Sequence, residues 1–325
     1  MTTNTPRSRP AIRALLIDLS GTLHIGSNPT PRAVAALQRL RSSRHIPFRF
    51  CSNTSKESTR DVISRLKSIG FDIHDHSSSG GKGKEVWTSV GAVGEVLAKK
   101  RLKRPFFLLS DSAREECASV LPVPPSDASY DSVVVGLAPS SLHYNNLTTA
   151  FRILVGEHET SPSSSGQRSK PNIPLIATHK AKYIQSSSGL SLGPGPFVQA
   201  LENAAGVTAE IVGKPTRAFF QAVIDDLGLE DTPEEEGKIV IVGDDIQSDL
   251  GGGALELGLW RVLGETSQCI LYLQSGADWD CAVKTGKYRA GDESKAGVQP
   301  PDEVCQDFAT FVDSLLGNGG IHARL

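Results

Sequence analysis

Residues 14–23 read ALLIDLSGTL, and this stretch decides the fold. Four apolar residues run without interruption into Asp18, which is the pattern of a strand buried on both faces in a parallel sheet. Such a strand delivers its last residue to the carboxyl edge of the sheet, where open α/β sheets bind their ligands. Gly21 lets the backbone turn sharply there. The stretch therefore predicts a carboxylate, Asp18, at a ligand-binding edge.

Strand and helix patterns alternate along the chain outward from that stretch. A helix is predicted to open at Thr30-Pro31, with Thr30 as its N-cap. A second strand, residues 48–51, is followed by a helix that ends at Gly70. Late in the chain, strands at 211–212 and 239–242 flank another helix. This alternation predicts the α/β class, with a Rossmann-like, doubly wound parallel sheet as its core.

A block between those two halves has strands and helices of its own. Strands are predicted at 106–109, 133–135 and 175–177, and a helix contains Leu147, Phe151 and Leu154. We interpret residues 77–192 as an α/β cap domain inserted into a core made of residues 11–76 and 193–325. Residues 1–10 are predicted to be a disordered tail, and the Ser/Gly-rich stretches 77–83 and 160–169 and the acidic triplet 234–236 to be loops.

The composition argues against several classes of partner. Lys and Arg number 34 against 36 Asp and Glu, for a net charge of -2, so nucleic acid and anionic membranes are not expected partners. No apolar run is long enough to span a bilayer. The five cysteines are odd in number and scattered, which favours a reducing compartment over zinc or disulfides. The cytoplasm is the expected location, with the nucleus as an alternative.

Three further strand ends carry polar side chains. Ser52-Asn53 offers a hydroxyl and backbone N–H groups where a helix starts, which suits an anion, although the same pair is also the ordinary form of an N-cap. Lys214 brings an ammonium that could hold a phosphate, or could be a plain surface lysine. Asp244 and Asp249 follow the most apolar strand, and such hard oxygen ligands suit Mg²⁺.

Acid, hydroxyl, lysine and acid pair, in that order, resemble the four sequence motifs of the haloacid dehalogenase superfamily. The resemblance covers nearly the whole chain, through residues 18–24, 52–58, 136–139, 193–196, 212–215, 243–253 and 284–289. It implies a Mg²⁺-dependent phosphatase whose nucleophile, Asp18, becomes transiently phosphorylated. It also implies a metal site made of Asp18, the backbone carbonyl of Ser20, Asp244 and Asp249. Ser52, Asn53 and Lys214 would hold the phosphoryl group, with Asp18, Ser20 and Lys214 at catalytic positions.

The predicted cap resembles the large α/β cap of the pyridoxal phosphate phosphatase class. In that class residues at the place of His179 and Lys180 contact substrate; the alternative is that both are exposed loop residues. The resemblance implies a small phosphorylated substrate, namely a phosphomonoester, a phosphoamide or pyrophosphate. Caps of this class often mediate dimers, so a homodimer is an open expectation.

Two features depart from the family pattern. Ser20 stands where most of these phosphatases carry a second aspartate that acts as general acid and base. This leaves open a weakly active or inactive capped module that binds phosphate and serves regulation. A metal-free dehalogenase is a third reading, but the packed acids at Asp244 and Asp249 would repel one another without a cation. The second departure is an extra segment, residues 261–282, which we interpret as a surface excursion or as translated intron sequence.

Overall fold

The structure is a computed structural model that describes residues 9–43, 46–74, 83–125, 128–158, 172–186, 189–229, 237–265, 291, 295 and 297–317. Several predicted features lie outside these residues. They are the tail over residues 1–8, the Ser/Gly-rich stretches apart from Gly83, the acidic triplet 234–236, and residues 266–282 of the extra segment. The start of that segment at residue 261 is wrong for a surface excursion, because residues 261–264 are buried in a strand.

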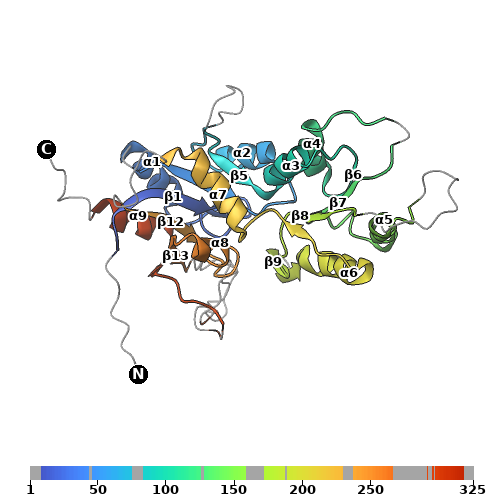
Figure 1. The fold of residues 1–325 in the computed structure, drawn as a ribbon. Helices are drawn as coiled ribbons and strands as arrows, with labels where there is room; N and C mark the ends of the chain where they lie inside the picture. Colours follow the sequence, from blue (N-terminus) through green and yellow to red (C-terminus); the bar gives the residue numbers. More distant parts are fainter. Residues whose placement is uncertain are drawn as a thin grey trace, which may run out of the picture. The chain divides into compact units, whose positions relative to one another are not determined.

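A six-stranded sheet contains the apolar run that ends at Asp18. Its strand order is β14-β13-β12-β1-β4-β5, and the pairs from β14 through to β4 are parallel. The strands are β1 (Ile12–Asp18), β4 (Phe48–Ser52), β5 (Val86–Thr88), β12 (Lys238–Gly243), β13 (Trp260–Gly264) and β14 (Glu303–Cys305). The order reverses between β1 and β12, so the carboxyl ends of these two strands flank the switch point where such sheets bind ligands (Figure 1).

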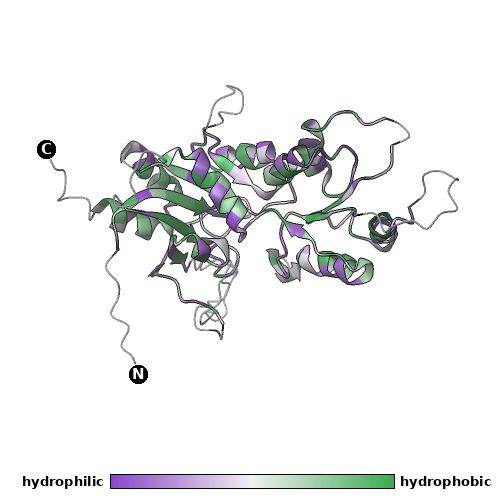
Figure 2. Cartoon of the chain, in the orientation of Figure 1, coloured by the Kyte–Doolittle hydropathy of each residue, from purple (hydrophilic) through white to green (hydrophobic). Residues whose placement is uncertain are grey.

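The apolar run of β1 is explained by its central place in this sheet. Residues 14–18 are all buried, and Ile17 is level with Val242 of β12 while Asp18 is level with Cys51 of β4. Strands β1 and β12 are hydrophobic over most of their length in Figure 2. The register brings Asp18 and the residues that follow β12 to the same edge.

Five described helices precede or follow strands of this sheet along the chain. They are α1 (Ala33–Ser43), α2 (Thr59–Ser68), α7 (Arg217–Asp226), α8 (Gly253–Glu256) and α9 (Phe308–Gly317). The predicted N-cap of the first helix is wrong. Thr30 donates its hydroxyl proton toward the carbonyls of Thr22 and Leu23, at 2.8 and 3.1 Å, and α1 begins three residues later at Ala33. A hydroxyl used in this way pins the loop that follows β1 instead of capping a helix.

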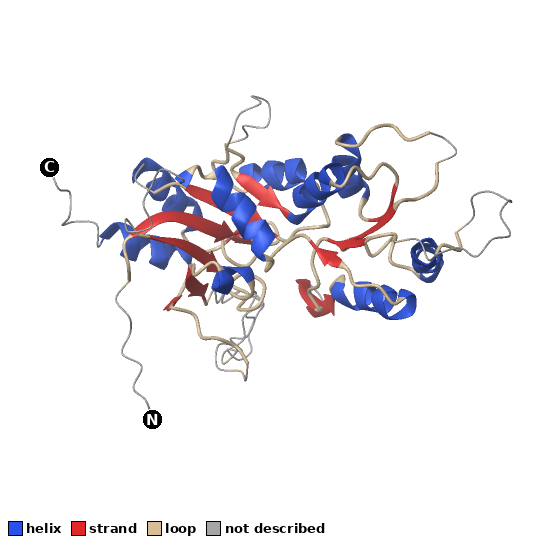
Figure 3. Ribbon diagram, viewed as in Figure 1, coloured by secondary structure: helices blue, strands red, loops and turns tan. Residues whose placement is uncertain are grey.

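A second parallel sheet, with order β11-β8-β7-β6, is formed by β6 (Pro105–Leu108), β7 (Ser132–Val135), β8 (Leu175–Ala177) and β11 (Glu210–Ile211). The chain around it also forms α3 (Ser89–Lys99), α4 (Asp111–Ser119), α5 (Tyr144–Val155) and α6 (Gly195–Ala205), coloured by type in Figure 3. One apolar core includes Ile153 and Val198 of α5 and α6, and another includes Val93 and Ala113 of α3 and α4. These strands and the helix with Leu147 confirm the predicted elements to within one residue.

One predicted strand pairs differently from the sequence interpretation. Ile211 was expected in the core half, but β11 pairs in parallel with β8, and Val212 N–H donates to the Ala177 carbonyl at 3.1 Å. Two short antiparallel hairpins complete the described strands: β2 (His24–Ile25) with β3 (Asn28–Pro29), and β9 (Tyr183–Ser186) with β10 (Gly189–Leu192). The α/β class with parallel sheets is confirmed.

The chain divides into two compact units. One consists of residues 1–51, 63–86 and 220–325, and the other of residues 52–62 and 87–219. The domain limits at 77 and 192 stay a prediction. Within the described part of the chain, no helix combines the length and the apolar character needed to cross a membrane.

Candidate active site

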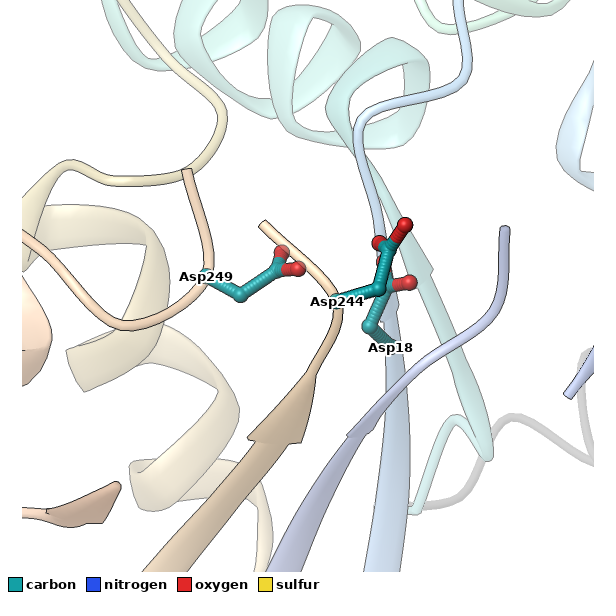
Figure 4. A group of neighbouring side chains, drawn as sticks. All are labelled: Asp18, Asp244 and Asp249. Carbon is teal, nitrogen blue, oxygen red and sulfur yellow. The ribbon is translucent and has the colours of Figure 1, made fainter. Parts of the chain in front are cut away.

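Three buried carboxylates meet at the carboxyl edge of the six-stranded sheet. Asp18, Asp244 and Asp249 are 5%, 2% and 2% exposed, and one carboxylate oxygen from each lies within 4.8 Å of the others. Figure 4 shows the carboxylate of Asp249 directed toward the other two. The structure therefore brings together the acids that the sequence placed at two separate strand ends.

Asp18 is the last residue of β1, and a neighbour in its own loop orients it. The hydroxyl of Thr22 donates to Asp18 Oδ2 at 3.2 Å, and Thr22 is itself held through its carbonyl by the Thr30 hydroxyl. The sequence pattern did not place either threonine in the site. The available signal was the short spacing of Thr22 from the acid, four residues along the same turn.

Two glycines make room for the acids. A side-chain carbon on Gly21 would lie 2.1 Å from Asp244 Oδ2, and Gly21 has φ +97°, which other residues rarely adopt. A carbon on Gly243 would lie 2.4 Å from Asp249 Oδ2. Both positions therefore require glycine because a carboxylate approaches the backbone closely. For Gly21 this requirement adds to the sharp turn that the sequence predicted.

The carboxylates of the acidic loop after β12 have different hydrogen-bond partners and different places. Asp245 Oδ1 accepts from the N–H groups of Gln247 and Ser248, at 3.0 and 2.9 Å, so that side chain closes the turn. Asp249 Oδ2 accepts from Asp245 N–H at 3.1 Å and belongs to the buried cluster. Asp244 and Asp249 are the acids of this loop that lie in the cluster.

The donor set of the cluster fits Mg²⁺. Three carboxylates this close and this buried would repel one another without a cation. Mg²⁺ takes hard oxygen ligands, usually a few carboxylates together with water and substrate phosphate. Among the described residues, Asp18, Asp244 and Asp249 are thus a group of carboxylates that could hold the metal.

The predicted phosphate-binding residues form a second group, all within the other compact unit. Ser52 ends β4 and is buried, and its hydroxyl accepts from Thr54 N–H at 3.2 Å. Asn53 exchanges two hydrogen bonds of 2.8 Å with the backbone of Lys214, whose side chain is 1% exposed. A carbon on Gly213 would lie 2.4 Å from Asn53 Oδ1, so glycine at this place permits the contact. Lys214 is not a surface lysine.

The remaining predicted site residues have different surroundings. Ser20 is exposed, and its backbone forms an isolated bridge with His24. Lys180 is exposed and its ammonium pairs with Glu202 at 2.6 Å. Burial acts to raise the pKa of Glu202, but hydrogen bonds from Lys180 and from Ala209 N–H outweigh it and lower that pKa below its usual value. His179, by contrast, is only 5% exposed and is not an exposed loop residue. Substrate contact by His179 and Lys180 stays a prediction.

The described cysteines are poor candidates for a nucleophile. Cys51, Cys117 and Cys305 are free thiols, and the first two are buried. Burial raises the pKa of Cys117 to about 12, and burial together with the nearby Glu303 does the same for Cys305. Thiols with such values are protonated at neutral pH and weakly reactive.

Comparison with known protein families gives a consistent result. A family model described as haloacid dehalogenase-like hydrolase matches residues 15–120. The chain is 39% identical over 306 residues to haloacid dehalogenase-like hydrolase domain-containing protein 2 of Homo sapiens, covering 94% of this chain and 96% of the relative. It is 32% identical over 309 residues to phospholysine phosphohistidine inorganic pyrophosphate phosphatase of Homo sapiens, covering 94% of each.

Solved structures share the fold. The 4-nitrophenylphosphatase of Thermotoga maritima superposes with a TM-score of 0.71 at 21% identity, over 93% of this chain and 97% of that one. The glycerol phosphate phosphatase of Mycobacterium tuberculosis in complex with magnesium has a TM-score of 0.66 at 23% identity, over 92% of this chain and 76% of that one.

Proposed function

The chain belongs to the haloacid dehalogenase-like hydrolase family, and from that premise we propose that it is a Mg²⁺-dependent phosphatase acting through an aspartyl-phosphate on a small phosphorylated substrate. The observation that carries this proposal is the cluster of Asp18, Asp244 and Asp249 at the switch point of the sheet. The relatives named above include phosphatases of phosphoamides, pyrophosphate and phosphomonoesters, which supports the reaction class.

Asp18 is the proposed nucleophile. Its carboxylate would attack phosphorus, the bond from phosphorus to the leaving group would break, and water would then hydrolyse the aspartyl-phosphate, which divides one difficult displacement into two easier ones. The Thr22 hydroxyl supports this role, because the hydrogen bond that it donates to Oδ2 limits the rotation of the carboxylate.

The metal would be held by Asp18, Asp244, Asp249 and the backbone carbonyl of Ser20. When bound, Mg²⁺ supplies positive charge that offsets the repulsion between an anionic nucleophile and an anionic phosphate. The solved relative that contains magnesium is consistent with this cation. Asp249 accepts a hydrogen bond from Asp245 N–H, which orients it for the ligand role.

Ser52, Asn53 and Lys214 are proposed to hold the transferring phosphoryl group. The Asn53 side chain fixes the backbone of Lys214 through two hydrogen bonds. The lysine side chain, which carries the ammonium, therefore extends from a backbone of defined position. Preorganised donors of this kind stabilise charge without reorganising during the reaction. His179 and Lys180 are proposed to influence substrate choice. They follow β8, and the carboxyl ends of its parallel neighbours β7 and β11 lie at the same edge of that sheet.

Ser20 narrows the proposed substrates. A serine cannot protonate a leaving oxygen as a carboxylic acid does, so substrates whose leaving group needs no proton are favoured: phosphoamides already protonated on nitrogen, pyrophosphate and activated aryl phosphates. One relative is named for phospholysine, phosphohistidine and pyrophosphate. The same serine also favours a second candidate function, a phosphate-binding regulatory module with little or no turnover.

Two remaining proposals concern the cellular compartment and the oligomeric state. The free thiols of Cys51, Cys117 and Cys305 support a reducing compartment such as the cytoplasm. A homodimer is proposed from the family resemblance, and light scattering on the purified protein measures it directly.

A panel of phosphoamides, pyrophosphate, aryl phosphates and alkyl phosphates tests the enzyme against the regulatory module. Metal-chelated protein is compared with protein resupplied with Mg²⁺. We expect Mg²⁺-dependent release of inorganic phosphate from the first three groups. Binding of phosphate without turnover on any substrate would support the regulatory module instead.

A further inference from the structure

His179 is held between two fixed partners inside one compact unit. The Ala181 N–H donates to His179 Nδ1 at 3.3 Å, and Nε2 lies 3.4 Å from the hydroxyl oxygen of Ser55. Both His179 and Ser55 are buried, at 5% and 2% exposure. Ser55 lies 124 residues away in sequence, three positions after Ser52.

The contacts assign the proton on the imidazole ring. A backbone N–H can only donate, so Nδ1 must accept and carries no proton. The neutral ring therefore has its proton on Nε2, which faces the Ser55 oxygen. In a doubly protonated ring the Nδ1–H and the Ala181 N–H would be two donors facing each other. The loop after β8 would then have to adopt another conformation.

Ser55 links this histidine to the proposed phosphate-binding segment, residues 52–55. Its oxygen also accepts from Leu137 N–H at 2.9 Å, just after β7. A side-chain carbon on Gly136 would come within 3.0 Å of the Ser55 Cβ and 2.6 Å of Leu109 Cδ2, so glycine is what lets the segment approach there. Ser55 is thus fixed from the ends of two neighbouring strands, β7 and β8.

We propose that His179 is a positioning residue: in its neutral form, protonated on Nε2, it holds Ser55 and thereby the segment 52–55, and it does not supply the proton that Ser20 cannot. This inference rests on the proposed function and assigns His179 a role within it. The effect on substrate choice runs through the geometry of the phosphate-binding segment.

Nitrogen-15 NMR of the histidine rings tests the tautomer without relying on activity. The His179 signals are identified by their loss in His179→Gln. At neutral pH we expect a protonated Nε2 and an unprotonated Nδ1, with ring shifts that move in Ser55→Ala and stay unchanged in His143→Gln, a change at an exposed residue before α5. A ring protonated on Nδ1, or on both nitrogens, would overturn the proposal whether or not the protein is a phosphatase.

Kinetics tests the role. Glutamine keeps an N–H donor near the place of Nε2 but cannot act as an acid, so His179→Gln should recover most of the substrate affinity, measured as KM, that His179→Ala loses. His179→Ala and Ser55→Ala should each raise KM about three- to tenfold, the size of a lost hydrogen bond, and the double variant should add little. A loss in kcat of about 10²-fold or more for alkyl phosphates in His179→Gln would mean that His179 is the acid.

The failure of the proposed function is separable from the failure of this inference. Wild-type protein with Mg²⁺ and no turnover on any substrate would refute the phosphatase. In that case the dissociation constant of inorganic phosphate replaces KM in the same set of variants. Equal affinities in wild type, His179→Ala and Ser55→Ala, all folded, would refute the positioning role.

Discussion

Asn53 and Lys214, 161 residues apart in the chain, exchange two hydrogen bonds: Lys214 N–H donates to Asn53 Oδ1 and Asn53 Nδ2 donates to the Lys214 carbonyl, each at 2.8 Å. The amide side chain satisfies both backbone groups of one residue, which only Asn or Gln can do with one donor and one acceptor side by side. The segment after β4 is thereby joined to the segment after β11 within one unit.

Asn53→Asp should weaken phosphate binding and the fold together. The carboxylate still accepts from Lys214 N–H but faces the Lys214 carbonyl with no donor, a buried repulsion that costs about 1–3 kcal/mol. We expect a lower urea midpoint and a higher dissociation constant for inorganic phosphate. Asn145→Asp, at an exposed residue of α5, is the control and should neither lower the urea midpoint nor raise the dissociation constant. Wild-type behaviour of Asn53→Asp would mean that the paired bonds contribute nothing.

Asp18→Asn should abolish turnover and leave the fold intact. The amide has nearly the same shape but cannot attack phosphorus, and it removes one charge from the three-carboxylate cluster. Without Mg²⁺ the melting temperature should equal or exceed that of wild type, because repulsion is relieved. The rise in melting temperature on adding Mg²⁺ should shrink. Substantial turnover by the well-folded variant would exclude Asp18 as the nucleophile.

Gly21→Ala should be far more damaging than Gly26→Ala. Both glycines have positive φ, +97° and +58°, so each alanine incurs about 1–2 kcal/mol of backbone strain. Only at Gly21 does the added carbon meet Asp244, and that overpacking brings the total to about 2–5 kcal/mol. Urea unfolding and the Mg²⁺-induced rise in melting temperature measure both effects. Equal losses in the two variants would show that strain alone matters.

Ser20→Asp should restore acid catalysis for poor leaving groups. Ser20 is exposed, so a carboxylate fits there without displacing core side chains. Positioned acid–base catalysis contributes about 10²- to 10⁴-fold, so alkyl phosphates should gain most and the dependence of rate on leaving-group pKa should flatten. Any burst of product before steady turnover should shrink. The measurement is a series of phosphate esters of graded leaving-group pKa. Parallel slopes for the two proteins would show that another group already donates the proton.

Glu303 should make stability depend on acid pH. Its half-burial raises the pKa, but the hydrogen bond and charge of Arg9, which donates from Nε at 2.8 Å, outweigh this and hold the pKa below its ordinary value of 4.5. A depressed folded pKa contributes stability that is present above the unfolded value and is lost as pH falls through the folded value. Urea unfolding from pH 7 to pH 3 should show wild type losing its advantage over Glu303→Gln below about pH 4.5. A constant difference across that range would contradict the assignment.

The sequence predicted the elements whose signal is local. An unbroken apolar run before Asp18, and another before Asp244, are typical of strands buried on both faces, and parallel strands of that kind end at one edge. The same reasoning failed at Thr30, because a hydroxyl that caps a helix and one that pins a loop look alike until its partners, the carbonyls of Thr22 and Leu23, are in place. It also placed Ile211 in the core half, whereas β11 pairs with β8, because a strand of two residues carries too little pattern to indicate its sheet.

The sequence by itself determined the α/β class and the position of Asp18 and Asp244 after two buried strands, because each of these follows from short-range periodicity and from residue type. Only the tertiary structure decided which side chains meet. That Asp245 closes a turn, that Asn53 pairs with Lys214, and that Ser55 lies against His179 are contacts set by packing. Such pairings depend on how distant strands fall into register, which no local pattern encodes.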